Sequence, residues 1–260
     1  TQSNDKPNQG YENKIISAGI STAFEQYRDL RLSLGLDASY DDLRTDSNAS
    51  SSLKKHEGTF SEIAGSYGIS YDLRDRAFAP TTGYITTFNQ KLPVAADEMY
   101  ISNTFSTSHY KPINENVIGS AKLYLSSING IGDDDARLSK RRFLSEKRLR
   151  GFERGKVGPI DSKDHIGGNY TAALNLETNL PNLIPDNYNA DAVFFLDFAN
   201  VWGVDYSDTI DDSNELRSST GVGVNWLSPI GPISFNFAQN LSKADTDKTQ
   251  SFSFNLGTTF

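Results

Sequence analysis

Polar and apolar residues alternate along most of this chain with a period of two, which is the spacing of a β-strand whose two faces meet different surroundings. The segment 217–227 places threonine, valine and tryptophan on one face and serine, glycine and asparagine on the other. The segment 30–42 opposes leucine and alanine to arginine, serine, glycine and aspartate. Helical periodicity is scarce, so the pattern predicts an all-β protein built from antiparallel strands.

About eleven segments show this alternation, and each is near the ~9–11 residues that a tilted strand needs to cross a bilayer. The segments 82–92, 99–111 and 191–203 alternate less cleanly than the others. The full set of predicted strands is 14–25, 30–42, 60–73, 82–92, 99–111, 116–128, 169–180, 191–203, 217–227, 231–241 and 249–260.

Two folds explain the alternation, a soluble β-sandwich and a transmembrane β-barrel. The polar faces are rich in glycine, serine, asparagine and threonine, as expected of a wet lumen. Aromatic residues occur near strand ends on the apolar faces, which is typical of a girdle at the membrane interface. These residues are Tyr40, Tyr71, Tyr84, Trp226 and Phe260. Alternation alone favours the barrel and leaves the sandwich open.

The lengths of the connectors favour the barrel further. Short and longer connectors alternate along the chain, beginning with the short 25–30 and the long 43–59. Outer-membrane barrels have tight periplasmic turns at one rim and longer extracellular loops at the other, whereas a sandwich has no reason to sort its loops in this way. The alternation of short and long connectors places Phe260 at the periplasmic rim. It places the long loops around Ser50, Arg150 and Asp211 at the outer rim.

The overall composition, taken without the alternation, is typical of a soluble, acidic protein. The 260 residues are 37% hydrophobic and 22% charged, with a net charge of -8 and a negative mean hydropathy. No run of about 18 apolar residues could form a transmembrane helix, and residues 1–10 lack the features of a signal peptide. The absence of cysteine excludes disulfides, thiolate metal sites and a cysteine nucleophile. A barrel fits these averages because half of each strand faces water.

The connector 129–168 contains the run Leu149-Arg150-Gly151-Phe152, followed by Val157-Gly158-Pro159 and Gly167-Gly168-Asn169. It resembles the long loop of the BamA-type superfamily of outer-membrane assembly and translocation barrels (the bacterial surface antigen superfamily), which carries a Val/Leu-Arg-Gly-Phe signature. Further segments resemble strands and turns of that family in the same order, namely 71–76, 175–177, 194–202, 226–232 and 252–260. An Arg-Gly-Phe alone is a weak motif, but the ordered set indicates the family.

The chain departs from the family in its length. The resemblance implies about sixteen strands preceded by periplasmic soluble modules, whereas the sequence predicts about eleven strands and none of those modules. An odd strand number conflicts with the even numbers of bacterial single-chain barrels. We therefore expect a C-terminal barrel portion at 13–260 after a loop remnant at 1–12, with the first strands and the upstream modules absent. Its edge strands would stay unpaired or pair with another chain.

The resemblance also implies that the long loop 129–168 folds back into the barrel, where Arg150 contacts acidic residues of the wall. Glu177 and Asp197 lie on the polar faces of their strands, so both should point into the lumen. A guanidinium presents a fork of donors that can bridge carboxylates in such a confined place. Gly151 would then allow a close backbone approach, and Phe152 would enter a neighbouring pocket.

From the residues alone, Arg150 is one of nine lysines and arginines within 137–156. Contact with anionic lipopolysaccharide and pairing inside the lumen both remain open for the cations around it. The acidic balance and the absence of a recognisable binding motif argue against nucleic acid as a partner. The surrounding cluster comprises Lys140, Arg141, Arg142, Lys147, Arg148 and Arg154.

The last predicted strand carries an apolar stripe that we expect to face lipid, formed by Phe252, Phe254, Leu256 and Phe260. The resemblance implies that this strand is an assembly signal and one side of a lateral seam, the place where the first and last strands of the barrel meet. Strand addition at an exposed edge is the physical basis of such recognition.

Catalytic chemistry has little support in the sequence. The three histidines, His56, His109 and His165, are scattered over loops and a strand end, and no serine–histidine–acid arrangement is recognisable. The acidic runs 133–135 and 211–212 lack the spacing of a calcium loop, so we interpret them as solvated loop acids. We expect no enzyme activity, no metal and no cofactor.

The resemblance implies a protein of the bacterial outer membrane that inserts and folds other β-barrel proteins through a lateral strand seam, without ATP. Nascent barrel clients, lipoproteins of an assembly complex and outer-membrane lipid or lipopolysaccharide are the implied partners. Two alternatives remain: a relative in the same superfamily that serves secretion or autotransporter assembly, and a passive porin-like channel.

Overall fold

The computed structural model of the chain describes residues 2–6, 10–181, 183–185, 188–207, 210, 214–229 and 231–256. Its main element is a 12-stranded antiparallel sheet in which the strands follow one another in chain order. The strands are β1 (Gln2–Lys6), β2 (Tyr11–Tyr27), β3 (Leu30–Thr45), β4 (Gly58–Asp72), β5 (Gly83–Ala96), β6 (Tyr100–Asn114), β7 (Val117–Gly130), β10 (Tyr170–Leu180), β11 (Ala190–Trp202), β12 (Arg217–Ser228), β13 (Gly231–Ser242) and β14 (Phe252–Leu256).

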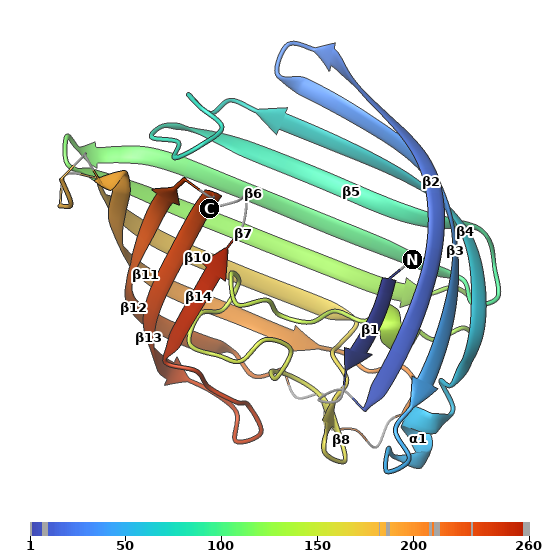
Figure 1. The fold of residues 1–260 in the computed structure, drawn as a ribbon. Coiled ribbons are helices and arrows are strands. Elements are labelled where there is room, and N and C mark those ends of the chain that lie inside the picture. Colours follow the sequence, from blue (N-terminus) through green and yellow to red (C-terminus); the bar gives the residue numbers. More distant parts are fainter. Residues whose placement is uncertain are drawn as a thin grey trace.

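The sheet curves around a central space, as Figure 1 shows, and the long loop between β7 and β10 lies on its concave side. We call residues 131–169 the long loop. β1 and β14 stand at the two ends of the strand order, and they do not pair with each other in the described part of the chain. The curved sheet is therefore an open portion of a barrel.

The sequence pattern located the strands well. Each of the eleven predicted segments coincides with a strand of the large sheet, from β2 to β14, so the prediction of antiparallel barrel strands is confirmed. The predicted terminal strand 249–260 is β14 over Phe252–Leu256. Phe260 lies outside the described residues, as do Asp211 and Asp212.

One prediction about the start of the chain is wrong. Residues 1–12 were expected to be a loop, but Gln2–Lys6 form β1 and pair with the first part of β2, from Gln2↔Ile15 to Lys6↔Tyr11. The segment is short and wholly polar, so it has no alternation to detect. Backbone pairing is satisfied at a sheet edge whatever the side chains are.

The faces of the sheet match a barrel in lipid rather than a sandwich. Large apolar side chains on the outer face are exposed, for example Ile20 (77%), Phe194 (51%) and Phe237 (59%). A soluble sandwich would bury such a face, whereas a membrane barrel presents it to lipid. In the described part of the chain, no helix is long and apolar enough to span a membrane.

Buried side chains gather on the concave side, where the loops meet the strands. One apolar cluster joins the long loop to β10 and β11. A second cluster joins the long loop to β2, β3 and the connector that contains α1 (Ser51–Lys54). One end of the lumen is thus packed with loop residues.

Candidate functional site

The long loop has little regular structure of its own, yet much of it is buried. It contains one turn of 3-10 helix, η1 (Leu138–Lys140), and a small hairpin formed by β8 (Ile160–Asp161) and β9 (Asp164–His165). A loop of this length without long elements is uncommon in a compact domain unless it has a function. Because much of the loop is buried, its polar groups need partners on the barrel wall, and two charged sites supply many of them.

The first place is the Arg150 site, which consists of Arg150, Gly151 and Phe152 with Glu177 and Asp197. Arg150 donates from Nε to Asp197 Oδ2 (2.7 Å) and from Nη2 to Asp197 Oδ1 (2.6 Å), a two-pronged pairing with one carboxylate. Its Nη1 lies 2.9 Å from Glu177 Oε1. The structure therefore brings together the three charged residues that the sequence singled out.

Neighbouring groups complete the polar contacts of the Arg150 site. The backbone N–H of Arg150 also donates to Asp197 Oδ2 (3.1 Å), and Asn175 donates to Asp197 Oδ1 (2.7 Å). Lys122 donates to Glu177. Asp197 is 0% exposed, and a buried carboxylate is tolerated when it is paired in this way.

The strands explain why these carboxylates converge. β10 and β11 are neighbours with Asn175 opposite Asp197 in the register, and Glu177 lies two positions further along β10. Since side chains alternate along a strand, all three point into the lumen. Burial alone would lower the pKa of Arg150, but its bond to Asp197 and the charge of Glu177 outweigh burial and raise that pKa. The guanidinium thus stays charged.

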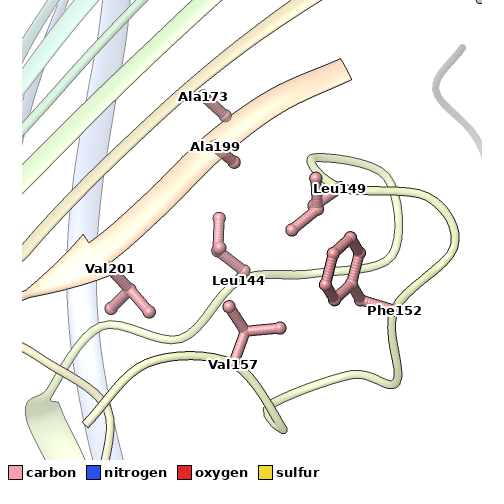
Figure 2. Close-up of a cluster of buried hydrophobic side chains, with 7 residues drawn as sticks. All are labelled: Leu144, Leu149, Phe152, Val157, Ala173, Ala199 and Val201. Atoms are coloured by element: carbon pink, nitrogen blue, oxygen red, sulfur yellow. The ribbon is translucent and has the colours of Figure 1, made fainter. Parts of the chain in front are cut away.

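Gly151 and Phe152 hold the loop close to the wall. Gly151 has a φ of 86°, a conformation that favours glycine, and a Cβ there would lie 3.1 Å from that of Ala238. Phe152 is 3% exposed and belongs to the first apolar cluster. Figure 2 shows this cluster, in which side chains of the loop face Ala199 and Val201. Gly151 allows the close approach, and Phe152 adds apolar packing beside the ion pair.

The second place is the Arg137 site, which consists of Arg137 and Lys140 with Asp41, Glu62 and Glu98. Arg137 donates from Nε to Glu98 Oε2 (2.9 Å), and its guanidinium lies 4.1 Å from the centroid of the Phe60 ring. Lys140 donates to Glu62 Oε2 (2.9 Å). The sequence pattern did not predict this site, although the isolated leucine beside Arg137 is a weak signal that η1 enters a core.

Other cations of the loop also face inward. Arg141 pairs with Asp205, Arg142 donates to Ser102, and the guanidinium of Arg148 lies 4.1 Å from the centroid of the Tyr124 ring. Of the predicted cluster, Lys147 and Arg154 are exposed. Pairing inside the lumen therefore accounts for most of the basic cluster, and contact with lipopolysaccharide stays a prediction.

The terminal strand exposes the apolar stripe predicted for it. Phe252, Phe254 and Leu256 are 44%, 50% and 58% exposed. The rings of Phe252 and Phe254 pack against Phe237 and Phe235 of β13, with centroids 5.0 and 5.4 Å apart.

The histidines lie in three different environments. His56 packs edge-on against Tyr206, His109 stacks on Tyr84, and His165 contacts the carbonyl oxygen of Thr246. Among the residues that the structure describes, no group of three or more histidine or acidic side chains could hold a metal ion.

Comparison with known proteins identifies relatives over the whole chain. The model of the Omp85 superfamily domain matches residues 1–260. The chain is 28% identical over 263 residues to the outer membrane protein assembly factor BamA of Neorickettsia risticii, covering 99% of this chain and 35% of that protein. It is 30% identical over 232 residues to BamA of Neisseria meningitidis serogroup B, covering 75% of this chain and 28% of that protein.

Solved structures agree with these relatives. The crystal structure of BamA from Haemophilus ducreyi lacking POTRA domains 1-3 matches with a TM-score of 0.83 at 26% identity, covering 94% of this chain and 54% of that one. CdiB from Acinetobacter baumannii shares the fold with a TM-score of 0.62 at 11% identity. The chain thus spans about a third of the length of the curated relatives described above.

Proposed function

This chain belongs to the Omp85 superfamily. We therefore propose that it forms part of the barrel wall of a protein that inserts and folds client β-barrel proteins in the outer membrane. The sheet is an integral part of the bacterial outer membrane, with its apolar face toward lipid. The BamA relatives are outer membrane protein assembly factors by name, and the full-length protein would carry out the same task.

The proposed mechanism uses strand pairing at a lateral seam and needs no ATP. β14 would separate from the first strand of the complete barrel and offer its edge to a client strand. An unpaired backbone group in lipid costs several kcal/mol, so pairing with an exposed edge is strongly favourable for the client. Client insertion would draw its free energy from these hydrogen bonds and from burial of apolar side chains in lipid, with no catalytic residue or cofactor.

The observation that carries the proposal is the docked long loop. A passive porin-like channel needs an open lumen, whereas here the loop contacts the walls formed by β4 and β11 through Lys140 and Arg150. A polar cavity of about 280 Å³ remains between the loop and the wall, lined by strands on both sides of the loop in the chain, from β6 and β7 to β14. A secretion or autotransporter translocase of the same superfamily is the alternative that this arrangement leaves open.

The test uses the full-length protein in liposomes with an unfolded barrel client. Arg150→Glu should reduce the rate of client folding, and adding Asp197→Arg should restore part of it because the pair is rebuilt with reversed charges. Arg154→Glu, an exposed cation of the same loop, is the matched control and should have no effect. Unchanged client folding in Arg150→Glu would remove the loop from the mechanism.

Single-channel conductance distinguishes the assembly proposal from a passive porin-like channel. The assembly proposal expects small or transient conductance from the wild-type protein, because the loop occupies the lumen. A large, steady conductance together with no client folding would favour the porin. Lipoproteins of an assembly complex and lipopolysaccharide are proposed partners, and co-purification of the full-length protein from its native membrane tests them.

A further inference from the structure

We propose that Asp247 is a positioning residue for the terminal strand β14. With Arg217, it holds the connector between β13 and β14 (residues 243–251) against the long loop, so that docking of the loop determines where β14 begins. The role in client assembly rests on the proposed function, whereas the geometry stands independently of it.

Asp247 joins three segments through one carboxylate. Its Oδ2 accepts from Arg217 Nε (2.8 Å) and its Oδ1 from Arg217 Nη2 (3.1 Å), which ties the connector to the start of β12. The backbone N–H of Ala244 donates to Oδ2 (2.8 Å), which closes a turn within the connector. The backbone N–H of Gly158, in the long loop, donates to Oδ1 (3.4 Å).

The ion pair between Arg217 and Asp247 is buried, so neither side chain can exchange its partner for water. Arg217 is 2% exposed and the side chain of Asp247 is 0% exposed. Arg217 also donates from Nη1 to Asn200 Oδ1 (2.6 Å) and to the carbonyl oxygen of Glu215 (2.8 Å). Because removal of one partner leaves the other charge buried and unpaired, the connector is held firmly in this one position.

The backbone of the connector is paired with the long loop as well. The N–H of Gln250 donates to Gly151 O (3.0 Å), and the N–H of Glu153 donates to Lys248 O (3.0 Å). Phe152 and Thr249 form an antiparallel bridge between these two bonds. The residues that follow Arg150 thus run beside the connector as a short antiparallel pair.

This pairing lies directly before the terminal strand. β14 begins at Phe252, and its described register covers the five pairs from Ile233↔Leu256 to Phe237↔Phe252. β13 is the one strand that pairs with β14 in the described part of the chain. A strand with one neighbour leaves the backbone groups of its other edge unpaired, so β14 is held by β13 and by the connector that precedes it. Docking of Arg150 on Asp197 is therefore transmitted through Gly151 and Asp247 to β14.

Amide hydrogen exchange of the full-length protein tests the geometry. Asp247→Asn keeps the size of the side chain and removes its charge. Exchange in residues 244–256 should become faster by about tenfold or more, because local opening is governed by the lost contacts. Exchange in η1 should stay unchanged. Asp245→Asn, an exposed acid of the same connector, is the matched control and should leave both regions as in the wild type.

Two further variants keep the test decisive. Arg217→Lys retains the charge but loses the planar fork, so it should show a smaller effect confined to the same residues, even if Asp247→Asn fails to fold. The double swap Arg217→Asp with Asp247→Arg should recover part of the protection at β14, which general destabilisation would not allow. Unchanged exchange at 252–256, or an equal increase in all outer loops, would overturn the positioning role.

Client folding by the same variants then connects the geometry to function. The rate of client folding should fall in Asp247→Asn and recover in the double swap, in proportion to protection of β14. If the wild-type protein folds no client, the proposed function fails, while the exchange measurements still decide whether Asp247 positions β14.

Discussion

The long loop contacts opposite parts of the barrel wall at the Arg150 site and the Arg137 site, and the two sites differ in how completely their charges are paired. At the Arg150 site, two nitrogens of the guanidinium meet the two oxygens of Asp197, and a third lies against Glu177. At the Arg137 site, one nitrogen donates to Glu98, and Asp41 lies 3.8 Å from Nη1. Neither Nη atom of Arg137 has a hydrogen-bond partner.

Packing compensates for the incomplete hydrogen bonding of Arg137. The guanidinium lies over the Phe60 ring, and the adjacent Leu138 is 0% exposed within the second apolar cluster. Asp41 has other donors, Asn13 and Ser139, so it does not depend on Arg137. The Arg150 site therefore requires an arginine for its charge geometry, whereas the Arg137 site uses the side chain mainly to fill space.

Removal of the guanidinium at the Arg150 site should have the largest effect. Arg150→Ala leaves Asp197 buried without its main partner, which costs about 3–5 kcal/mol. The free energy of unfolding in detergent, measured with urea, should fall by that amount. Arg154→Ala should leave it unchanged. A loss no larger than that of Arg137→Met would contradict the comparison.

A methyl group at Gly151 should have the next largest effect. Gly151→Ala strains a backbone with φ of 86° and brings Cβ within 3.1 Å of Ala238, so we expect a loss of about 1–3 kcal/mol. Gly132→Ala is the matched control, because Gly132 has a φ of 71° and no atom within 4 Å of an added Cβ. Urea unfolding should show a larger loss for Gly151→Ala, and equal losses would mean that the wall does not confine the loop.

Replacement of the guanidinium at the Arg137 site should cost less. Arg137→Met keeps much of the apolar stem and leaves Glu98, whose side chain is 26% exposed, accessible to water. We expect a loss of about 1–2 kcal/mol in the free energy of unfolding. Arg150→Met should lose clearly more in the same urea titration. Equal values for the two methionine variants would show that both sites depend on charge to the same extent.

A fall in pH should cause the smallest loss of stability among these changes, in the region around the Arg137 site. Burial, followed by the charge of Arg141, lowers the pKa of His56 from 6.5 to about 4. Below pH 6.5 the unfolded chain binds a proton that the folded chain does not, so the stabilisation is complete above pH 6.5 and is lost as pH falls toward 4.

At pH 5.5 this loss is about 1 kcal/mol. Amide exchange in residues 46–57 should be faster at pH 5.5 than at pH 7.5, after correction for the intrinsic pH dependence of exchange. His56→Gln, which cannot be protonated, should remove the difference. The same acid sensitivity in that variant would assign the effect to another group.

Much of the fold could be predicted because a barrel strand repeats its environment at every second residue. The segments with clear alternation, such as 217–227, and the less regular 82–92 both form strands. β1 was not predicted because it is short and polar, and its pairing with β2 uses only the backbone. The position of Arg150 could be inferred because its glycine and phenylalanine form a recognisable motif.

The alternation of residues was enough to predict the strand pattern, the lumenal side of Glu177 and Asp197, and the exposed apolar stripe of β14. These features depend on local periodicity, which every strand carries in its own residues. Which of the nine cations in 137–156 are paired depends on the packing of distant segments, since Asp41 and Glu62 come from different strands and Glu98 from the connector between β5 and β6. The ion pair of Arg217 and Asp247 also arises there, because burial and partner choice depend on how distant segments pack.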